Sequence, residues 1–319
     1  MCDDTTEAEN EVYLQRQGLR RRELALGAGA AAAVLLAGCK RDSAAASTTE
    51  PSPEAGSAEP QASVEASAEA SAAVAVEGRM VSVEMAEGSA EAYFVAPTSG
   101  RHPGVLIWPD IAGLRQSFMD MATRLAEAGY AVLAVNQYYR SSKLPVLESF
   151  SEWRTEEGKA KIAPMIEALS AEGIASDGAA FVAWLDQQAQ VDTGRKIGTT
   201  GYCMGGPFTF RTAAARADRV GAIGSFHGGG LVTQEADSPH QLIPEMRAAL
   251  LICVAENDDE RDPEAKTTLH QAAEVAGRTA EIEVYPAQHG WCVTDSPVYD
   301  EVQAERAWAR LLATFEAEL

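Results

Sequence analysis

A cysteine in a glycine-rich turn is the residue of this chain best placed for nucleophilic chemistry. Cys203 lies in Gly201-Tyr202-Cys203-Met204-Gly205-Gly206, between a predicted strand at 195–200 and a predicted helix at 207–216. This order, with the nucleophile between two glycines, is typical of a nucleophile elbow with Cys in the place of Ser. The dipole and free N–H groups of a helix N-terminus favour a thiolate there. The alternative interpretation is a buried structural cysteine.

Two further side chains follow predicted strands and could complete a proton-transfer set. Asp258 follows the predicted strand 249–254, and His289 follows the last predicted strand, 280–285. The chain order of nucleophile, acid and histidine is that of the α/β-hydrolases. The imidazole would move a proton, and the carboxylate would fix the tautomer of the ring. Asp259 competes for the acid role, and we favour Asp258 because it comes first after the strand.

Strands and helices alternate along the chain and would position these groups. The predicted strands are 80–85, 90–96, 103–108, 130–135, 195–200, 220–226, 249–254 and 280–285. The predicted helices are 115–128, 177–189 with Asp177 as its cap, 207–216, 263–276 and 301–315. This alternation predicts an α/β fold, the α/β-hydrolase three-layer sandwich with a mostly parallel, doubly wound sheet. Reactive groups would lie at the carboxyl ends of its strands. The insertion 141–176 is predicted to be a lid or side wall.

The first 77 residues differ in composition from a folded core. Residues 1–38 contain paired arginines, then a short apolar run, then small residues, which is typical of a secretory signal of the twin-arginine kind. The run is too short for a transmembrane helix. The residues before Cys39 resemble a lipobox, which implies cleavage there, lipidation of Cys39 and export to the cell envelope. An ordinary cleaved signal is the alternative. Residues 39–77 are rich in Ala, Ser and Glu and predict a disordered tether. Residues 78–319 form the predicted domain.

Charge and cysteine spacing exclude several classes of protein. The chain has 26 Lys and Arg against 47 Asp and Glu, a net charge of −21, which argues against nucleic-acid binding. Its five cysteines contain no C-x-x-C pair, so neither a zinc site nor a thioredoxin-like motif is indicated. Cys253 and Cys292 could form a disulfide in an exported protein. Unpaired burial is the alternative that we favour.

The motifs around Cys203, Asp258 and His289, taken together, resemble the dienelactone hydrolase family over most of residues 80–319. The resemblance implies an enzyme that hydrolyses a small carboxylic ester or lactone with a Cys-His-Asp triad and without a metal or organic cofactor. It also implies an oxyanion hole made by the backbone N–H groups of Ile111 and Met204, a device that stabilises the tetrahedral intermediate.

This sequence departs from the family pattern at two positions. Asp110 stands where the family usually has a glutamate that holds and releases the thiol. Val293 stands where the family has an arginine that binds the substrate carboxylate, which argues for a less charged ester or lactone. We expect the pocket to include Asp110, Tyr138, His227 and Trp291, although aromatic residues also serve as plain core. His227 could instead satisfy backbone groups.

Two other functions are compatible with these residues, a non-catalytic ligand-binding module on a hydrolase fold and a thiol redox protein. Rapid alkylation of Cys203 would favour the enzyme over the binding module. The absence of a second nearby cysteine weakens the redox interpretation. The sequence leaves the oligomeric state open.

Overall fold

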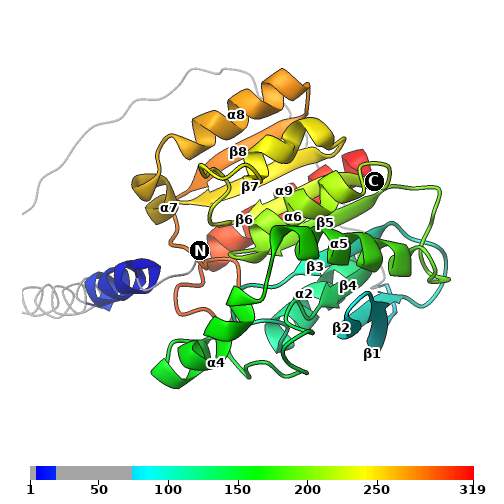
Figure 1. The fold of residues 1–319 in the computed structure, drawn as a ribbon, viewed down its shortest axis with the longest axis horizontal. Helices are drawn as coiled ribbons and strands as arrows, with labels where there is room; N and C mark the ends of the chain where they lie inside the picture. The colour runs from blue at the N-terminus through cyan, green and yellow to red at the C-terminus, as the bar shows by residue number, and fades with distance from the viewer. Residues whose placement is uncertain (1–4, 19–73) are drawn as a thin grey trace, which may run out of the picture. The chain divides into compact units, whose positions relative to one another are not determined.

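Residues 5–18 and 74–319 are described in the computed structural model of the chain (Figure 1). Residues 5–18 form a helix. Within the described residues, contacts group residues 5–13 with Val74–Leu319 in one compact unit, and residues 14–18 belong to a different unit. The predicted signal cleavage site, Cys39 and most of the predicted tether lie outside the described residues. Within the described residues, no helix has the length and apolar character needed to span a bilayer.

Eight strands form a single sheet in the order β1-β2-β4-β3-β5-β6-β7-β8. Their bounds are β1 (Val76–Met85), β2 (Gly88–Pro97), β3 (Gly104–Trp108), β4 (Ala131–Val135), β5 (Ile197–Tyr202), β6 (Val220–Phe226), β7 (Ala249–Ala255) and β8 (Ala280–Tyr285). The β1–β2 and β2–β4 pairs are antiparallel, and every other pair is parallel. The eight predicted strands and the mostly parallel sheet are therefore confirmed. Continuous burial of β3 to β6 explains their uninterrupted apolar or small residues.

Helices cover both faces of the sheet, which gives the predicted three layers (Figure 1). The helices are α2 (Gln116–Glu127), α3 (Phe150–Trp153), α4 (Glu156–Glu167), α5 (Ala171–Leu185), α6 (Gly205–Ala215), η1 (Pro239–Glu245), α7 (Glu256–Arg261), α8 (Ala265–Ala276) and α9 (Glu301–Glu318). The apolar side chains of α2 and α9 share one buried cluster, and those of α5, α6 and α8 share the other. The sheet thus separates two cores.

The helix predicted at 177–189 begins earlier than expected, so the capping role predicted for Asp177 is wrong. The N-cap of α5 is Ser170, whose side chain accepts a hydrogen bond from the Gly173 N–H. A serine hydroxyl serves this position as well as a carboxylate does. Asp177 instead lies inside α5, where its buried carboxylate accepts hydrogen bonds from Arg140 and Tyr139.

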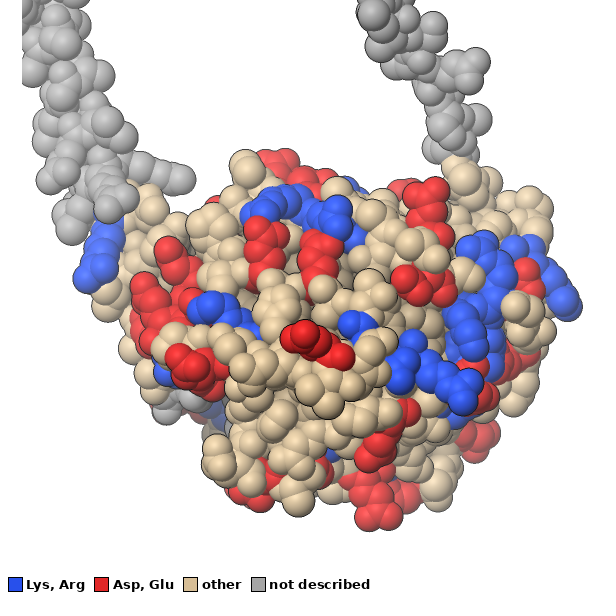
Figure 2. All heavy atoms as spheres, turned by 90° about the horizontal axis from the view of Figure 1, so that it is seen from above, with Lys and Arg blue, Asp and Glu red and all other residues tan. Residues whose placement is uncertain are grey.

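The predicted insertion 141–176 is mostly helical, because it contains α3, α4 and the start of α5. The Thr155 side chain caps α4 by accepting from the Gly158 N–H. The insertion belongs to the same compact unit as the sheet. Figure 2 shows acidic and basic side chains interspersed on one face of the molecule, so the negative charge is not gathered in one patch there.

Candidate active site

Cys203 sits at the turn from β5 into α6, with a left-handed backbone (φ 53°) and 1% exposure. The two flanking glycines are required by close backbone contacts. A Cβ on Gly201 would lie 2.0 Å from the Gly205 oxygen, and a Cβ on Gly205 would lie 2.3 Å from the Trp108 oxygen. The turn therefore has the tight geometry expected of a nucleophile elbow, with a non-glycine residue held at positive φ.

His289 lies against Asp258, and the charge of Cys203 also acts on its ring. Its Nδ1 is 2.6 Å from Asp258 Oδ2, and its ring is 1% exposed. Burial alone would lower the pKa of His289. The charges of Asp258 and Cys203, together with the hydrogen bond to Asp258, outweigh burial and raise that pKa to about 10. A sulfur, an imidazole and a carboxylate in this order can move a proton between a nucleophile and a leaving group.

The structure separates the two candidate carboxylates. Asp258 points to His289, whereas Asp259 pairs with Lys266 at 2.5 Å. Both residues belong to the short helix α7 rather than to the loop that the sequence predicted. Residues 258 and 259 are successive on a helix and therefore face different directions. The helix also carries Asn257, whose Oδ1 accepts a hydrogen bond from the His289 N–H at 2.8 Å.

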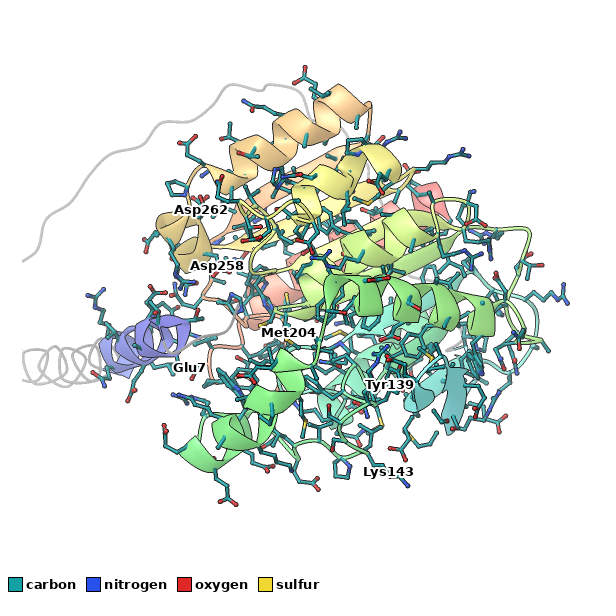
Figure 3. All side chains as sticks on the ribbon, in the orientation of Figure 1. Glu7, Tyr139, Lys143, Met204, Asp258 and Asp262 are labelled. Carbon is teal, nitrogen blue, oxygen red and sulfur yellow. The ribbon has the colours of Figure 1, made fainter. Side chains whose placement is uncertain are left out.

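Tyr138 connects the two residues whose amides were predicted to form an oxyanion hole. Its hydroxyl donates to the Ile111 carbonyl at 2.8 Å and lies 3.8 Å from Met204 Sδ. Ile111 follows β3, and Met204 precedes α6. Figure 3 shows Met204 and Asp258 at the same edge of the sheet, where the parallel strands end. The predicted groups thus converge, as the topology requires.

Asp110 is held by an arginine that the sequence analysis missed. Arg115 donates to both carboxylate oxygens of Asp110, at 2.7 and 2.9 Å, and also binds both oxygens of Asp295, at 2.7 and 2.8 Å. Burial opposes the charge of Arg115, but the two carboxylates raise its pKa. Asp295 accepts from the Phe150 N–H at 3.0 Å. One buried cation therefore joins the loop after β3, the loop after β8 and the start of α3.

A signal for this cluster does exist in the sequence. Arg115 is a charged residue directly after the apolar stretch 111–114, at the start of a predicted helix. A charge in such a place calls for a buried partner, since an unpaired buried charge is costly. Asp110 lies nearby in the chain, but Asp295 is 180 residues away, and no local pattern identifies it.

His227 and Trp291 are buried side by side. His227 has a left-handed backbone (φ 41°), and its Nδ1 accepts from the Cys203 N–H at 3.2 Å. Its ring centroid lies 4.9 Å from that of His289 and 5.1 Å from that of Trp291. Trp291 stacks on Tyr285. Burial and the charge of His289 lower the pKa of His227 well below its usual range, so its imidazole is neutral.

The remaining described cysteines are unpaired. Cys253 and Cys292 are free and buried, so the alternative of a disulfide between them is wrong and unpaired burial is confirmed. Burial raises the pKa of Cys253 to about 12 and raises that of Cys292 as well. Such thiols are poor nucleophiles at neutral pH.

Side chains of residues 5–13 contact helix α7, which carries Asp258, and the loop after β8, which carries His289. Asn10 Nδ2 donates to the His289 carbonyl at 3.0 Å. Glu9 accepts from Asn257 at 3.1 Å and from Arg261 at 2.6 Å. Asn10 is 2% exposed. The N-terminal residues of the compact unit therefore contribute to the burial around α7 and the His289 loop.

Known proteins resemble this chain over most of its described residues. The pattern of the dienelactone hydrolase family matches residues 90–319. A Methylorubrum extorquens protein named as a carboxymethylenebutenolidase is 26% identical over 72% of this chain and 78% of its own length. A Bradyrhizobium protein named as a 2-oxo-3-(5-oxofuran-2-ylidene)propanoate lactonase is 26% identical over 69% of this chain and 86% of its own.

The fold is also that of solved structures. The crystal structure of a Klebsiella pneumoniae protein described as a dienelactone hydrolase superposes with a TM-score of 0.65 at 23% identity. The alignment covers 76% of this chain and 99% of that one. At this identity the likeness establishes the fold, an α/β sandwich with eight strands here.

Proposed function

Because this chain belongs to the dienelactone hydrolase family, we propose that it hydrolyses a small carboxylic ester or lactone with Cys203 as nucleophile, His289 as acid and base, and Asp258 as the partner of His289. The observation that carries this proposal is the buried His289 ring, which is hydrogen-bonded to Asp258 and whose pKa is raised by the charges of both Asp258 and Cys203. The relatives named as a carboxymethylenebutenolidase and as a lactonase support the substrate class.

The proposed reaction has two halves. In the first, the Cys203 thiolate attacks the carbonyl carbon, the carbon–oxygen bond of the ester breaks, and His289 gives its proton to the departing alkoxide. In the second, His289 takes a proton from water, the resulting hydroxide attacks the thioester, and the carbon–sulfur bond breaks to restore the thiolate. A lactone follows the same course, with its alkoxide remaining attached to the acyl group.

The backbone amides of Ile111 and Met204 are proposed to stabilise the oxyanion formed in both halves. The hydrogen bond of Tyr138 to the Ile111 carbonyl supports this role, because it fixes the peptide plane next to the first donor. Losing one such donor typically costs about 100- to 1000-fold in rate.

Val293 supports a substrate without a carboxylate at that position. It is 1% exposed and apolar, where the family has an arginine. Asp110 is the second difference from the family pattern, and Arg115 binds both of its carboxylate oxygens. Burial and the charge of Cys203 nevertheless raise the pKa of the Asp110 carboxyl against the opposing effect of Arg115. We propose that the opposite charges of Cys203 and His289 set the resting state of the nucleophile.

The enzyme is further proposed to reach the cell envelope and to be anchored there through lipidated Cys39. The basic, apolar and small-residue order of residues 1–39 supports this location. Expression of the full chain and of Cys39→Ser in a bacterium, followed by separation of membranes from soluble material, tests it. Both forms in the same fraction would contradict the anchor.

The direct test of the activity compares wild type with Cys203→Ala on a panel of aryl esters and lactones. The variant is expected to lose at least about a thousandfold in kcat, because removing a nucleophile removes the whole covalent route. Cys292→Ala, at a second buried cysteine, is the matched control and should keep its rate. In wild-type protein recovered from an acid-quenched reaction, the peptide that contains Cys203 should carry the acyl group. Unchanged turnover by Cys203→Ala would refute the proposal.

A further inference from the structure

Cys203 and His227 share an unusual backbone conformation. Among the described residues they are the two non-glycine residues with positive φ, at 53° and 41°. They follow the neighbouring strands β5 and β6. A left-handed backbone is unfavourable for a non-glycine residue, so surrounding contacts must maintain it. The His227 N–H provides one such contact by donating to the Cys253 carbonyl on β7 at 2.8 Å.

The imidazole of His227 is bound to the backbone of the nucleophile. The Cys203 N–H is shared between the Phe226 carbonyl, at 3.0 Å, and His227 Nδ1, at 3.2 Å. Because Nδ1 accepts this hydrogen bond, the proton of the neutral ring is on Nε2. Nε2 is buried and has no acceptor among residues 5–18 and 74–319. Within the described protein, the His227 side chain therefore makes its hydrogen bond to the Cys203 amide.

The same ring also touches the base. The His227 and His289 centroids are 4.9 Å apart with their planes at 59°, and Trp291 packs at 67° on another side of His227. His227 is 1% exposed, so these contacts leave it little freedom. One side chain thus contacts the amide of the residue that attacks and the imidazole that moves the proton.

We propose that His227 is a positioning residue for the hydrolysis, which fixes the Cys203 backbone through Nδ1 and orients the His289 ring by packing against it. This inference rests on the proposed function of Cys203 and His289. Phenylalanine would fill a similar volume but has no acceptor for the Cys203 amide. Asparagine carries Oδ1 as many bonds from Cβ as Nδ1 is in histidine, and it tolerates positive φ. The two substitutions therefore separate the hydrogen bond from the packing.

The experiment measures kcat and KM on an aryl ester for wild type, His227→Phe and His227→Asn, with thermal unfolding to show that each variant is folded. His227→Phe is expected to lower kcat by about 100-fold with little change in KM, since small displacements of reacting groups have effects of this size. His227→Asn should recover at least about tenfold of that loss. If His227→Phe does not fold, His227→Ala replaces it.

A second readout separates this inference from the proposed function. The rate at which iodoacetamide alkylates Cys203 does not require the protein to be an esterase. His227→Phe should change that rate by about tenfold, and His227→Asn should restore it. Equal kcat and equal alkylation in wild type and His227→Phe would overturn the positioning role. Equal defects in the Phe and Asn variants would overturn it too, because the acceptor would then be irrelevant. If the wild-type protein turns over no ester, but His227→Phe still changes the alkylation rate of Cys203, only the proposed function is rejected.

Discussion

Asp258 accepts a hydrogen bond from His289 across 2.6 Å, whereas Asp259, the next residue, pairs with Lys266. Two adjacent carboxylates on one short helix thus have different partners. Asp258 is 14% exposed at its side chain, while the His289 side chain is fully buried. The adjacent pair therefore supplies a test variant and its own control.

Asp258→Asn is expected to lower kcat by about a thousandfold or more, because the amide no longer holds the ring tautomer or stabilises the imidazolium. Asp259→Asn should stay within about twofold of wild type, since it loses a partly buried ion pair with Lys266 and no bond to His289. Steady-state kinetics on the same ester measures both. Similar losses in the two variants would contradict the assignment of Asp258.

The pKa of His289 should depend on the charges of Asp258 and Cys203. Its pKa is raised from 6.5 to about 10 in the folded protein. A raised histidine pKa stabilises the fold fully below about pH 6.5, and this contribution disappears as pH rises through about 10. Catalysis by the imidazolium should fade over the same upper range. Asp258→Asn removes a charge that raises the pKa, so NMR titration of the ring should show a lower value. An unchanged midpoint would count against this coupling.

Arg115→Met should destabilise the protein by about 3–5 kcal/mol, because it leaves the buried Asp110 carboxylate without its partner. Arg124→Met is the matched control on the following helix. Arg124 pairs with Glu305 at the surface, where such pairs contribute about 0–1 kcal/mol. Urea unfolding of both variants gives the comparison. A loss in Arg115→Met no larger than that in Arg124→Met would show that the cluster is not structurally important.

Tyr138→Phe should reduce kcat about fivefold with KM nearly constant. The change removes a hydrogen bond to the Ile111 carbonyl, a contribution of about 1 kcal/mol. Tyr139→Phe is the control, since its hydroxyl donates to Asp177 instead. Its kcat should remain that of wild type. If the two variants are indistinguishable in kcat, Tyr138 does not support the oxyanion site.

A chain lacking residues 1–18 should expose the site. Asn10 binds the loop that carries His289, and Glu9 binds helix α7, which carries Asp258. These residues also lie in the predicted signal peptide, so cleavage would remove them. Alkylation of Cys203, followed by peptide mass spectrometry, should be about tenfold faster in the shortened chain. Asn10→Ala should lie between the two forms, and exposed Glu11→Ala should match the full chain. Equal alkylation rates in all forms would show that residues 1–18 do not shield Cys203.

The sequence by itself determined the features that depend on local pattern. Apolar runs located the eight strands, and two glycines around Cys203 identified the elbow, because only small residues fit a turn that tight. The position of Cys203, Asp258 and His289 after three predicted strands implied their convergence, since parallel strands end at one edge.

Only the tertiary structure decided which groups touch across long distances in the chain. It assigned Asp258 rather than Asp259 to His289 through the direction of α7, and it joined Arg115 to Asp295. It also put the His227 ring against the Cys203 amide. These contacts depend on helix rotation, strand register and side-chain rotamers. No residue pattern in a single chain encodes them, because each is settled by packing among elements that are far apart in sequence.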